Sequence, residues 1–388
     1  MSKRALLRFP SDATFKDLED LAKAILSEED SELWIPNSLK YNGGFGVEGA
    51  ALQVIGTWLR SSKTHVLRTY AKKIDDPVEF SKLCSRLFGL CSLRLADEIH
   101  NQSKKPVELK VALNSAVPSF KSLRQEDYKL AFKGLYVTIP SIKAHAVEKS
   151  KDREFDNPLY NLKNEVVDAE KFLEVTESVL GSILTAKVLS SMSEKGMVPH
   201  IAEILRELFT NTHRHARSDG VRKPYIKNFR SIVFNTMVLT EARAKELSSS
   251  GASSLFFGEW MPKGKAQLQA LDITIVDSGP GFARKWFKTN STDFSIEDEK
   301  QAIVDCFTKH NSSDPEDSSG SGLSNVLKDL KQLRGWMRLR TGRTLLEKSF
   351  FTSLGDDSVT TKDINGKEVF MEGVVFNVVI PIEALKSN

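Results

Sequence analysis

Three polar side chains recur at helical spacing in a run that is otherwise apolar on one side. In IAEILRELFTNTHRHA, spacing of about 100° per residue brings Glu207, Asn211 and Arg214 into one narrow wedge. A carboxylate can take a proton, a carboxamide can offer an oxygen to a hard cation, and a guanidinium can pair with phosphate. The wedge therefore predicts a site for a metal-bound anionic ligand, although the run alone also fits a solvated helix face.

A second candidate is an acidic residue at the end of an apolar strand. The stretch LQALDITIV ends in Asp277-Ser278-Gly279-Pro280-Gly281. A carboxylate at this point can accept a hydrogen bond from a planar amino group, while Gly279 and Gly281 leave the backbone bare enough for a flat ring to approach. Alone, this Asp-x-Gly-x-Gly sequence also fits an ordinary turn.

A third candidate is a pair of glycines directly before an amphipathic helix. Gly320-Ser321-Gly322-Leu323 runs into SNVLKDLKQL. Free backbone amides and the positive end of the helix dipole at such a start favour an anion. We therefore predict a phosphate-binding turn over Gly320 to Leu323.

A sheet and its covering helices must position these candidates. Period-two and helical patterns predict strands at 230–240, 268–276, 336–341 and 374–382, after a helical stretch at 159–193. The first two strands fit an antiparallel pair with an unusually long connection. Together with the upstream helix, residues 155–388 are predicted to form an α+β domain with helices layered on one mixed, mainly antiparallel sheet.

Residues 1–150 alternate short apolar strands with amphipathic helices, which predicts a smaller α/β domain. The pattern includes one helix over 78–99 and a last strand at 135–140. The expected boundary is the charged bridge from Ala146 to Pro158, which a proline closes. The order of elements resembles the anti-sigma-antagonist type of α/β domain, and the role of this part stays open.

Composition narrows the class of protein. Of 388 residues, 40% are hydrophobic and 27% charged, and no apolar run approaches the roughly 20 residues that a membrane span needs. The net charge of +4 is too slight to indicate nucleic-acid binding. Cys84, Cys91 and Cys306 match neither a zinc site nor a disulfide framework. The first residues lack the pattern of a secretory signal, so we expect a cytoplasmic protein that does not contact membranes.

In their order along the chain, the three motifs resemble those of the GHKL superfamily of ATPases, which includes gyrase, the heat-shock chaperone ATPases, histidine kinases and the mismatch-repair ATPases. The resemblance covers the C-terminal three fifths of the chain. It implies a Bergerat-type sandwich of helices on a sheet, with ATP as the ligand and Mg2+ as the cofactor.

The resemblance also implies a role for each motif residue. Asn211 corresponds to the magnesium ligand, and Glu207 to the carboxylate that activates water in hydrolytic members. Arg214 stands where many members have a phosphate-contacting Lys or Arg, and Asp277 resembles the residue that reads the adenine amino group. The remaining matches are Gly279 and Gly281, which shape the adenine pocket, and the phosphate-side glycine box of Gly320, Ser321, Gly322 and Leu323, which follows a polar segment similar to the ATP lid.

Two positions need separate comment. The last strand of the family usually carries Thr between Gly and x-Phe, but Gly373-Val374-Val375-Phe376 has Val374, which puts the water-bridged adenine contact of that Thr in doubt. His215 stands where a His or Tyr is common. Because it lies at the margin of the apolar face of its helix, we expect it to pack rather than to catalyse.

Three functions are open for such a site. The leading expectation is a Mg-dependent ATP-binding protein that hydrolyses ATP slowly and uses lid ordering as a conformational switch. The second is a protein serine/threonine kinase of the anti-sigma-factor-kinase type, and the third is an ATP-gated interaction module without turnover. Histidine autokinase activity is disfavoured, because Asn161 to Pro199 contains no histidine. A protein partner or a second copy of the chain is expected.

Overall fold

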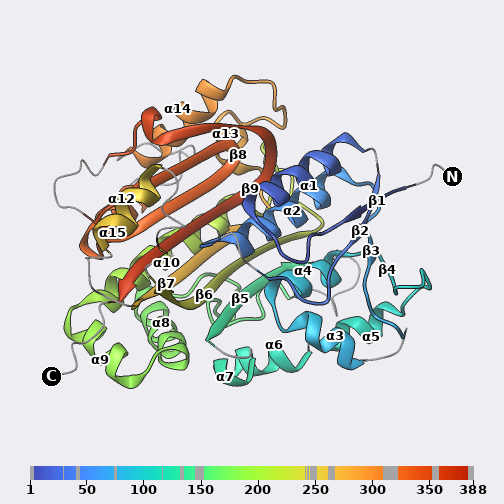
Figure 1. Ribbon diagram of the computed structural model, residues 1–388, viewed down its shortest axis with the longest axis horizontal. Coiled ribbons are helices and arrows are strands. Elements are labelled where there is room, and N and C mark those ends of the chain that lie inside the picture. Colours follow the sequence, from blue (N-terminus) through green and yellow to red (C-terminus); the bar gives the residue numbers. More distant parts are fainter. Residues whose placement is uncertain are drawn as a thin grey trace.

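The chain folds around two sheets, one parallel and one antiparallel, with helices between and beside them (Figure 1). It is therefore a mixed α and β protein, as the sequence predicted. Within the parts that the structure describes, no helix combines the length and the apolar character needed to cross a membrane. The computed structural model describes residues 4–28, 30–40, 44–73, 77–115, 117–131, 135–144, 153–240, 242, 244, 251–260, 267–308, 322–351 and 358–382.

The parallel sheet has the strand order β1-β2-β3-β4. Its strands are β1 (Ala5–Arg8), β2 (Ser31–Trp34), β3 (Val66–Arg68) and β4 (Glu98–His100). The helices that connect them are α1 (Phe15–Ser27), α2 (Val47–Ser61), α3 (Pro77–Cys84) and α4 (Leu87–Leu95). Three short helices follow, α5 (Leu109–Asn114), α6 (Val117–Arg124) and α7 (Tyr128–Ala131).

The single helix predicted over 78–99 is wrong, because this stretch divides into α3, α4 and strand β4. The chain turns at Arg86, whose backbone is extended at the start of α4. Gly89 lets α4 pass close to the end of α3, since a Cβ there would lie 2.1 Å from the carbonyl oxygen of Leu83.

The antiparallel sheet has the order β5-β6-β7-β9-β8. Its strands are β5 (Tyr136–Lys143), β6 (Asn228–Thr240), β7 (Gln267–Asp277), β8 (Trp336–Ser349) and β9 (Ile364–Ile382). Every neighbouring pair is antiparallel, so the mixed sheet that the sequence predicted is antiparallel throughout. The predicted antiparallel pairing of 230–240 with 268–276 is confirmed by β6 and β7, from Arg230 opposite Asp277 to Thr240 opposite Gln267.

Strand β5 belongs to the antiparallel sheet although it precedes the expected boundary at 146–158. Residues 1–150 therefore supply one whole sheet and the edge strand of the other. Seven of the eight residues of β5, Tyr136 to Ile142, are buried. Burial on both sides is explained by α4, which packs on β5, and by α8 (Ala169–Ile183), which also contacts it.

Of the helical stretch predicted over 159–193, residues 159–168 are not helical, and the rest forms two helices, α8 and α9 (Ala186–Glu194). Each begins at a polar cap, because the side chain of Asp168 accepts a hydrogen bond from Lys171 and that of Thr185 accepts one from Val188. The remaining helices of the described chain are α10 (Met197–His215), α12 (Gly251–Trp260), α13 (Gly281–Trp286), α14 (Ile296–Phe307), α15 (Gly322–Gln332) and the short 3-10 helix η2 (Thr361–Asp363).

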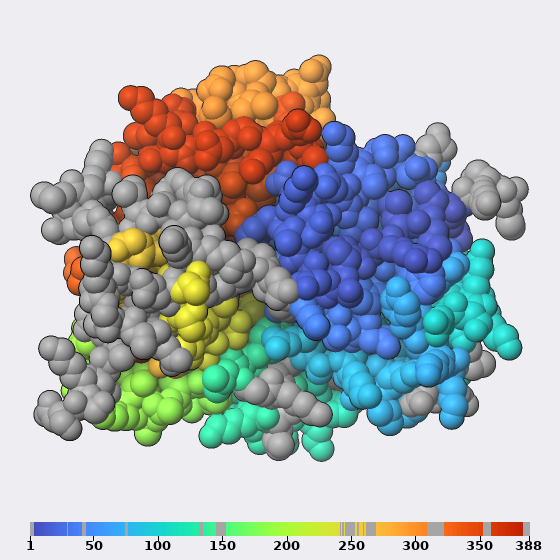
Figure 2. Space-filling view, in the orientation of Figure 1, coloured from blue at the N-terminus to red at the C-terminus, as the bar shows by residue number. Residues whose placement is uncertain are grey.

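Helices cover both faces of the antiparallel sheet (Figure 1). On one face α1 and α2 lie between the two sheets, with α2 against β7 and β9. Residues 47–59 of α2 are all buried, as expected for a helix that has protein on every side. On the other face α10 packs on β6 and β7, and α13 on β8 and β9. One apolar core runs through both sheets, and Figure 2 shows the N-terminal residues packed directly against the C-terminal strands.

Candidate functional site

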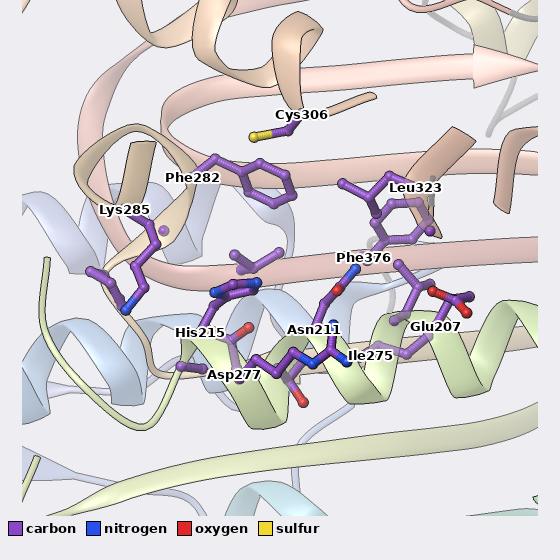
Figure 3. A pocket seen from close by; sticks show the side chains of 18 of the residues that line it. Glu207, Asn211, His215, Ile275, Asp277, Phe282, Lys285, Cys306, Leu323 and Phe376 are labelled. Carbon is purple, nitrogen blue, oxygen red and sulfur yellow. The ribbon is translucent and has the colours of Figure 1, made fainter. Parts of the chain in front are cut away.

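The predicted motifs meet at one cavity on the α10 side of the antiparallel sheet (Figure 3). The cavity holds about 1060 Å³ of empty space, part of it open to solvent. Its walls come from α10, from the end of β7, from the middle of β9, and from α13, α14 and the start of α15. The lining residues are Glu207, Leu208, Asn211, Thr212, Arg214, His215, Ala216, Ile275, Asp277, Pro280, Gly281, Phe282, Lys285, Trp286, Cys306, Gly322, Leu323, Val374 and Phe376.

Most of the predicted site residues are among these, namely Glu207, Asn211, Arg214, Asp277, Gly281, Gly322 and Leu323. Gly279 does not line the cavity, but it contacts two elements that do. Gly320 and Ser321 lie outside the described residues, as do residues 309–319 of the polar segment 287–319 that the sequence likens to the ATP lid. The earlier part of that segment is described and contains α14. The structure thus brings together parts of all three motifs.

Helix α10 forms a wall of this cavity. It begins after Gly196, which has a φ of 67°, and its apolar side, including Leu205 and Phe209, is buried in the core. Glu207 and Asn211 are half-buried, and Arg214 is exposed, one turn further along. The polar wedge that the sequence predicted therefore faces the cavity, and Arg214 also reaches solvent.

The carboxylate of Glu207 lies between a cation and a helix start. The Nη2 atom of Arg206 donates to its Oε1 at 2.5 Å, and Arg206 also binds Glu203 through two nitrogens. On the other side, a Cβ on Gly322 would come within 2.3 Å of Glu207 Oε2. The start of α15 thus lies close to this carboxylate, so positive charge from Arg206 and from the helix dipole converges on it.

Asp277 ends strand β7 and is the buried acid of the cavity, with 4% of its surface exposed. Burial raises the pKa of this carboxyl to about 7. The backbone N–H groups of Gly279 and Val374, together with the charge of Arg230, partly offset that effect. The Gly279 N–H donates to Asp277 Oδ1 at 2.8 Å. A hydrogen-bond donor on a ligand would stabilise the ionised form that burial disfavours.

Close backbone approaches explain the glycines around Asp277. A Cβ on Gly279 would lie 2.7 Å from Ala216 Cα at the end of α10. Gly281 has a φ of +79°, and a Cβ there would lie 2.6 Å from Thr341 Oγ1. Gly373 also has a φ of +79°, and its Cβ would overlap the carbonyl oxygen of Asp277 at 2.0 Å. Side chains at these positions would push the strand end away from its neighbours.

The position at which the family carries Thr is apolar here. Val374 lines the cavity, so the residue that departs from the family pattern faces the candidate site and supplies no hydroxyl there. The hydroxyl of Thr341 on β8 accepts from the Phe282 N–H at 3.3 Å. Thr341 is not among the residues that line this cavity.

Sequence reasoning missed most of the apolar lining. The ring centroids of Phe282 and Phe376 each lie 6.4 Å from that of Phe307, and the rings of Phe282 and Phe307 are parallel. Burial raises the pKa of the Cys306 thiol to about 12, which keeps it neutral. Lys285, whose Nζ donates to Ser218 Oγ at 3.1 Å, also lines the cavity and brings a cation to it (Figure 3). Its place four residues after the Asp-x-Gly-x-Gly motif was the one signal available.

His215 also lines the cavity, where the sequence predicted a packing role. Its ring lies near Asp277 and Asn211 in Figure 3. Contact with the cavity is compatible with packing, so the structure leaves that prediction untested.

Candidate metal ligands are few. Among the residues that the structure describes, no three His, Cys, Asp or Glu side chains cluster in a way that could hold a metal ion. Asn211 offers one amide oxygen to the cavity. A divalent cation at Asn211 would therefore take its other ligands from water or from a bound anion, which is how Mg2+ is commonly held beside phosphates.

No family model, curated protein or solved structure matches the chain. The function must therefore be inferred from the residues around the cavity.

Proposed function

We propose that the chain is a Mg-dependent ATP-binding protein of the GHKL type, with a Bergerat-type fold in its C-terminal part, and that it hydrolyses ATP slowly. One observation carries the proposal. A single cavity has the buried carboxyl of Asp277 toward one end, Asn211 in the middle, and Glu207 with Leu323 toward the other end (Figure 3). This order matches a base, a metal-bound polyphosphate and an attacking water along one ligand.

The Asp277 end suits a purine that carries an amino group. A buried carboxyl with a pKa near 7 gains stability when a donor reaches it, and the 6-amino group of adenine is such a donor. Phe282, Ile275 and Val374 supply apolar surface for the faces of a flat ring. The missing side chains of Gly279 and Gly281 keep the backbone close enough for both contacts.

The Glu207 end suits phosphate. Helix α15 begins at Gly322, so the backbone amides of its first turn and its positive dipole end point toward this part of the cavity. The exposed guanidinium of Arg214 adds a flexible cation. These groups would hold the phosphates while the base occupies the Asp277 end.

The donor set at Asn211 fits a magnesium ion that shares most of its ligands with phosphate and water. Such an ion, when bound, would neutralise charge that develops on the phosphates. Asn211 would orient the ion, and Glu207 would accept a proton from the attacking water. Arg206 would hold the Glu207 carboxylate in one orientation through its hydrogen bond. We further propose that ordering of the lid couples the bound nucleotide to a partner chain or to a second copy.

The test is to incubate the purified chain with Mg-ATP labelled on the γ-phosphate and to separate free phosphate, ADP and labelled protein. We expect saturable binding and slow release of labelled phosphate. Label on protein would instead favour the serine/threonine kinase, and binding without either product would favour the ATP-gated interaction module. Lack of ATP binding would overturn the proposal.

Glu207→Ala should keep ATP binding and lose turnover by a factor of roughly 10² to 10⁴, the usual contribution of a general base. Glu203→Ala is the matched control, because Glu203 lies on the same helix and also binds Arg206 but does not line the cavity. It should keep both binding and turnover. Unchanged hydrolysis in Glu207→Ala would remove Glu207 from the mechanism.

A further inference from the structure

Helix α2, from the N-terminal part of the chain, packs against β7 and β9 on the face of the sheet opposite the cavity. The hydroxyl of Thr57 accepts from the N–H of Glu372 at 3.1 Å, and Gln53 Nε2 donates to the carbonyl of Gly373 at 3.4 Å. Glu372 and Gly373 are the two residues before Val374, and Val374 lines the cavity on the opposite face of β9. The backbone behind the cavity is therefore held by a helix that belongs to the other sheet.

The last turn of α2 carries Arg60, which binds the loop after Asp277. Its Nε and Nη2 atoms donate to the carbonyl oxygen of Ser278 at 3.2 and 2.8 Å. Its Nη1 atom donates to the carbonyl of Lys227 at 2.9 Å, and its guanidinium lies 3.5 Å from the ring centroid of Tyr225. Arg60 does not line the cavity, so it has no direct contact with a ligand there.

One peptide group connects Arg60 to the buried acid. The carbonyl of Ser278 accepts from Arg60, and the N–H of the same peptide, that of Gly279, donates to Asp277 Oδ1 at 2.8 Å. The N–H of Ser278 donates to the carbonyl of Phe229 on β6. The hydroxyl of Ser278 also donates to that carbonyl, and it accepts from Arg60 Nη2 at 3.4 Å. Because a peptide group is planar, fixing the direction of its carbonyl also fixes the direction of its N–H. The guanidinium also polarises this peptide, which strengthens the bond that its N–H makes to the carboxylate.

We propose that Arg60 is a positioning residue for Asp277, through which the N-terminal part of the chain sets how well the cavity recognises an amino group on its ligand. The inference rests on the proposed function, in which that amino group belongs to adenine. Arginine suits the role because its planar fork reaches two carbonyls while it stacks on Tyr225, whereas a lysine ammonium cannot do all three. A displacement of α2 relative to β7 would therefore change the direction of the Gly279 N–H that donates to Asp277.

The experiment compares two nucleotides that differ by one group. ATP carries the 6-amino group, and purine riboside triphosphate lacks it. The unaltered chain should bind ATP more tightly. Arg60→Gln should weaken ATP binding by roughly tenfold, the loss expected when one hydrogen bond to a charged group is misaligned, and should leave purine riboside triphosphate binding unchanged. Arg60→Lys should have an ATP affinity between those of the unaltered chain and Arg60→Gln. It also replaces Arg60→Gln in the test if the Gln variant does not fold.

Two controls separate positioning from general support. Arg68→Gln removes another arginine of the N-terminal part. Arg68 is on β3 of the parallel sheet, pairs with Glu32 and lies 5.0 Å from the ring centroid of Trp34. Arg68→Gln should leave the preference for ATP intact. In an Asp277→Asn background, Arg60→Gln should cause no further loss of preference, because the residue through which it acts has been changed.

The outcomes are distinct. If the unaltered chain binds neither nucleotide, the proposed function itself fails. If it prefers ATP and Arg60→Gln keeps the full preference, or loses affinity for both nucleotides equally, the positioning role is overturned while the proposed function stands. Thermal unfolding of each variant confirms that the comparison is made on folded protein.

Discussion

Replacing Asp277 with asparagine isolates the free-energy cost of burying one carboxylate beside the cavity. Burial raises the pKa of Asp277 to about 7, from 3.8. Between these two pH values the folded chain keeps a proton that the unfolded chain has released. The stability linked to this carboxyl is therefore complete below the unfolded value and is lost as pH rises toward 7.

The size of the effect follows from the two pKa values. They are about 3 pH units apart, and each unit corresponds to about 1.4 kcal/mol, so the full cost of ionisation is roughly 4 kcal/mol. At about pH 5, roughly 1.5 kcal/mol of it has been lost, which leaves roughly 3 kcal/mol between about pH 5 and about pH 8. Asparagine stays neutral, so Asp277→Asn should gain roughly 3 kcal/mol in stability relative to the unaltered chain over this interval.

Urea unfolding of both chains at about pH 5 and about pH 8, without ligand, measures this difference. Asp272, on the same strand, is a second buried carboxyl whose pKa burial raises to about 7. Its titration occurs in both chains and cancels in the comparison, and Asp272→Asn should reproduce the same sign. An equal stability difference at both pH values would refute the reasoning, because it would mean that Asp277 is ionised at little cost in the folded chain.

Two further predictions concern the same strand end. A donor on the ligand favours ionised Asp277, so ATP affinity should rise as pH increases toward about 7 and then level off. Calorimetry measures this affinity, and the same titration with purine riboside triphosphate accounts for protonation of the phosphates. Identical pH profiles for the two nucleotides would contradict the prediction. Gly373→Ala should lose roughly 2–4 kcal/mol in urea unfolding, because its φ is +79° and the new Cβ would overlap Asp277. Gly258→Ala, on helix α12 where a Cβ meets nothing within 4 Å, should be neutral or stabilising by about 1 kcal/mol, and similar losses in both would remove the steric explanation.

The parts of the site that the sequence predicted correctly depend on local geometry. Helical spacing alone brings Glu207, Asn211 and Arg214 to one side of α10, whatever the helix packs against. Likewise, an apolar run that ends in an acid and glycines predicts a strand end at Asp277. The structure adds that these two local patterns face the same cavity.

The parts that the sequence did not predict depend on contacts between distant residues. Periodicity identifies 135–140 as a strand but cannot say which sheet it joins, because its partner Asn228–Thr240 is far along the chain. Phe282, Cys306 and Phe376 line the cavity, yet their residue types are those of any core. Arg60 reads as an ordinary basic residue in the last turn of a helix. Its role depends on main-chain carbonyls, which no side-chain pattern reveals.

The position of α2 between the two sheets bears on how such a chain can change in evolution. A fragment beginning after residue 153 would lack both α2, whose residues 47–59 are buried, and the edge strand β5. Without α2, the apolar face of β7 and β9 that this helix covers would be exposed to water. The two sheets are therefore not separable modules that recombination could exchange one at a time. A new N-terminal specificity would have to arise by substitution within this chain, with α2 and the strand ends changing together.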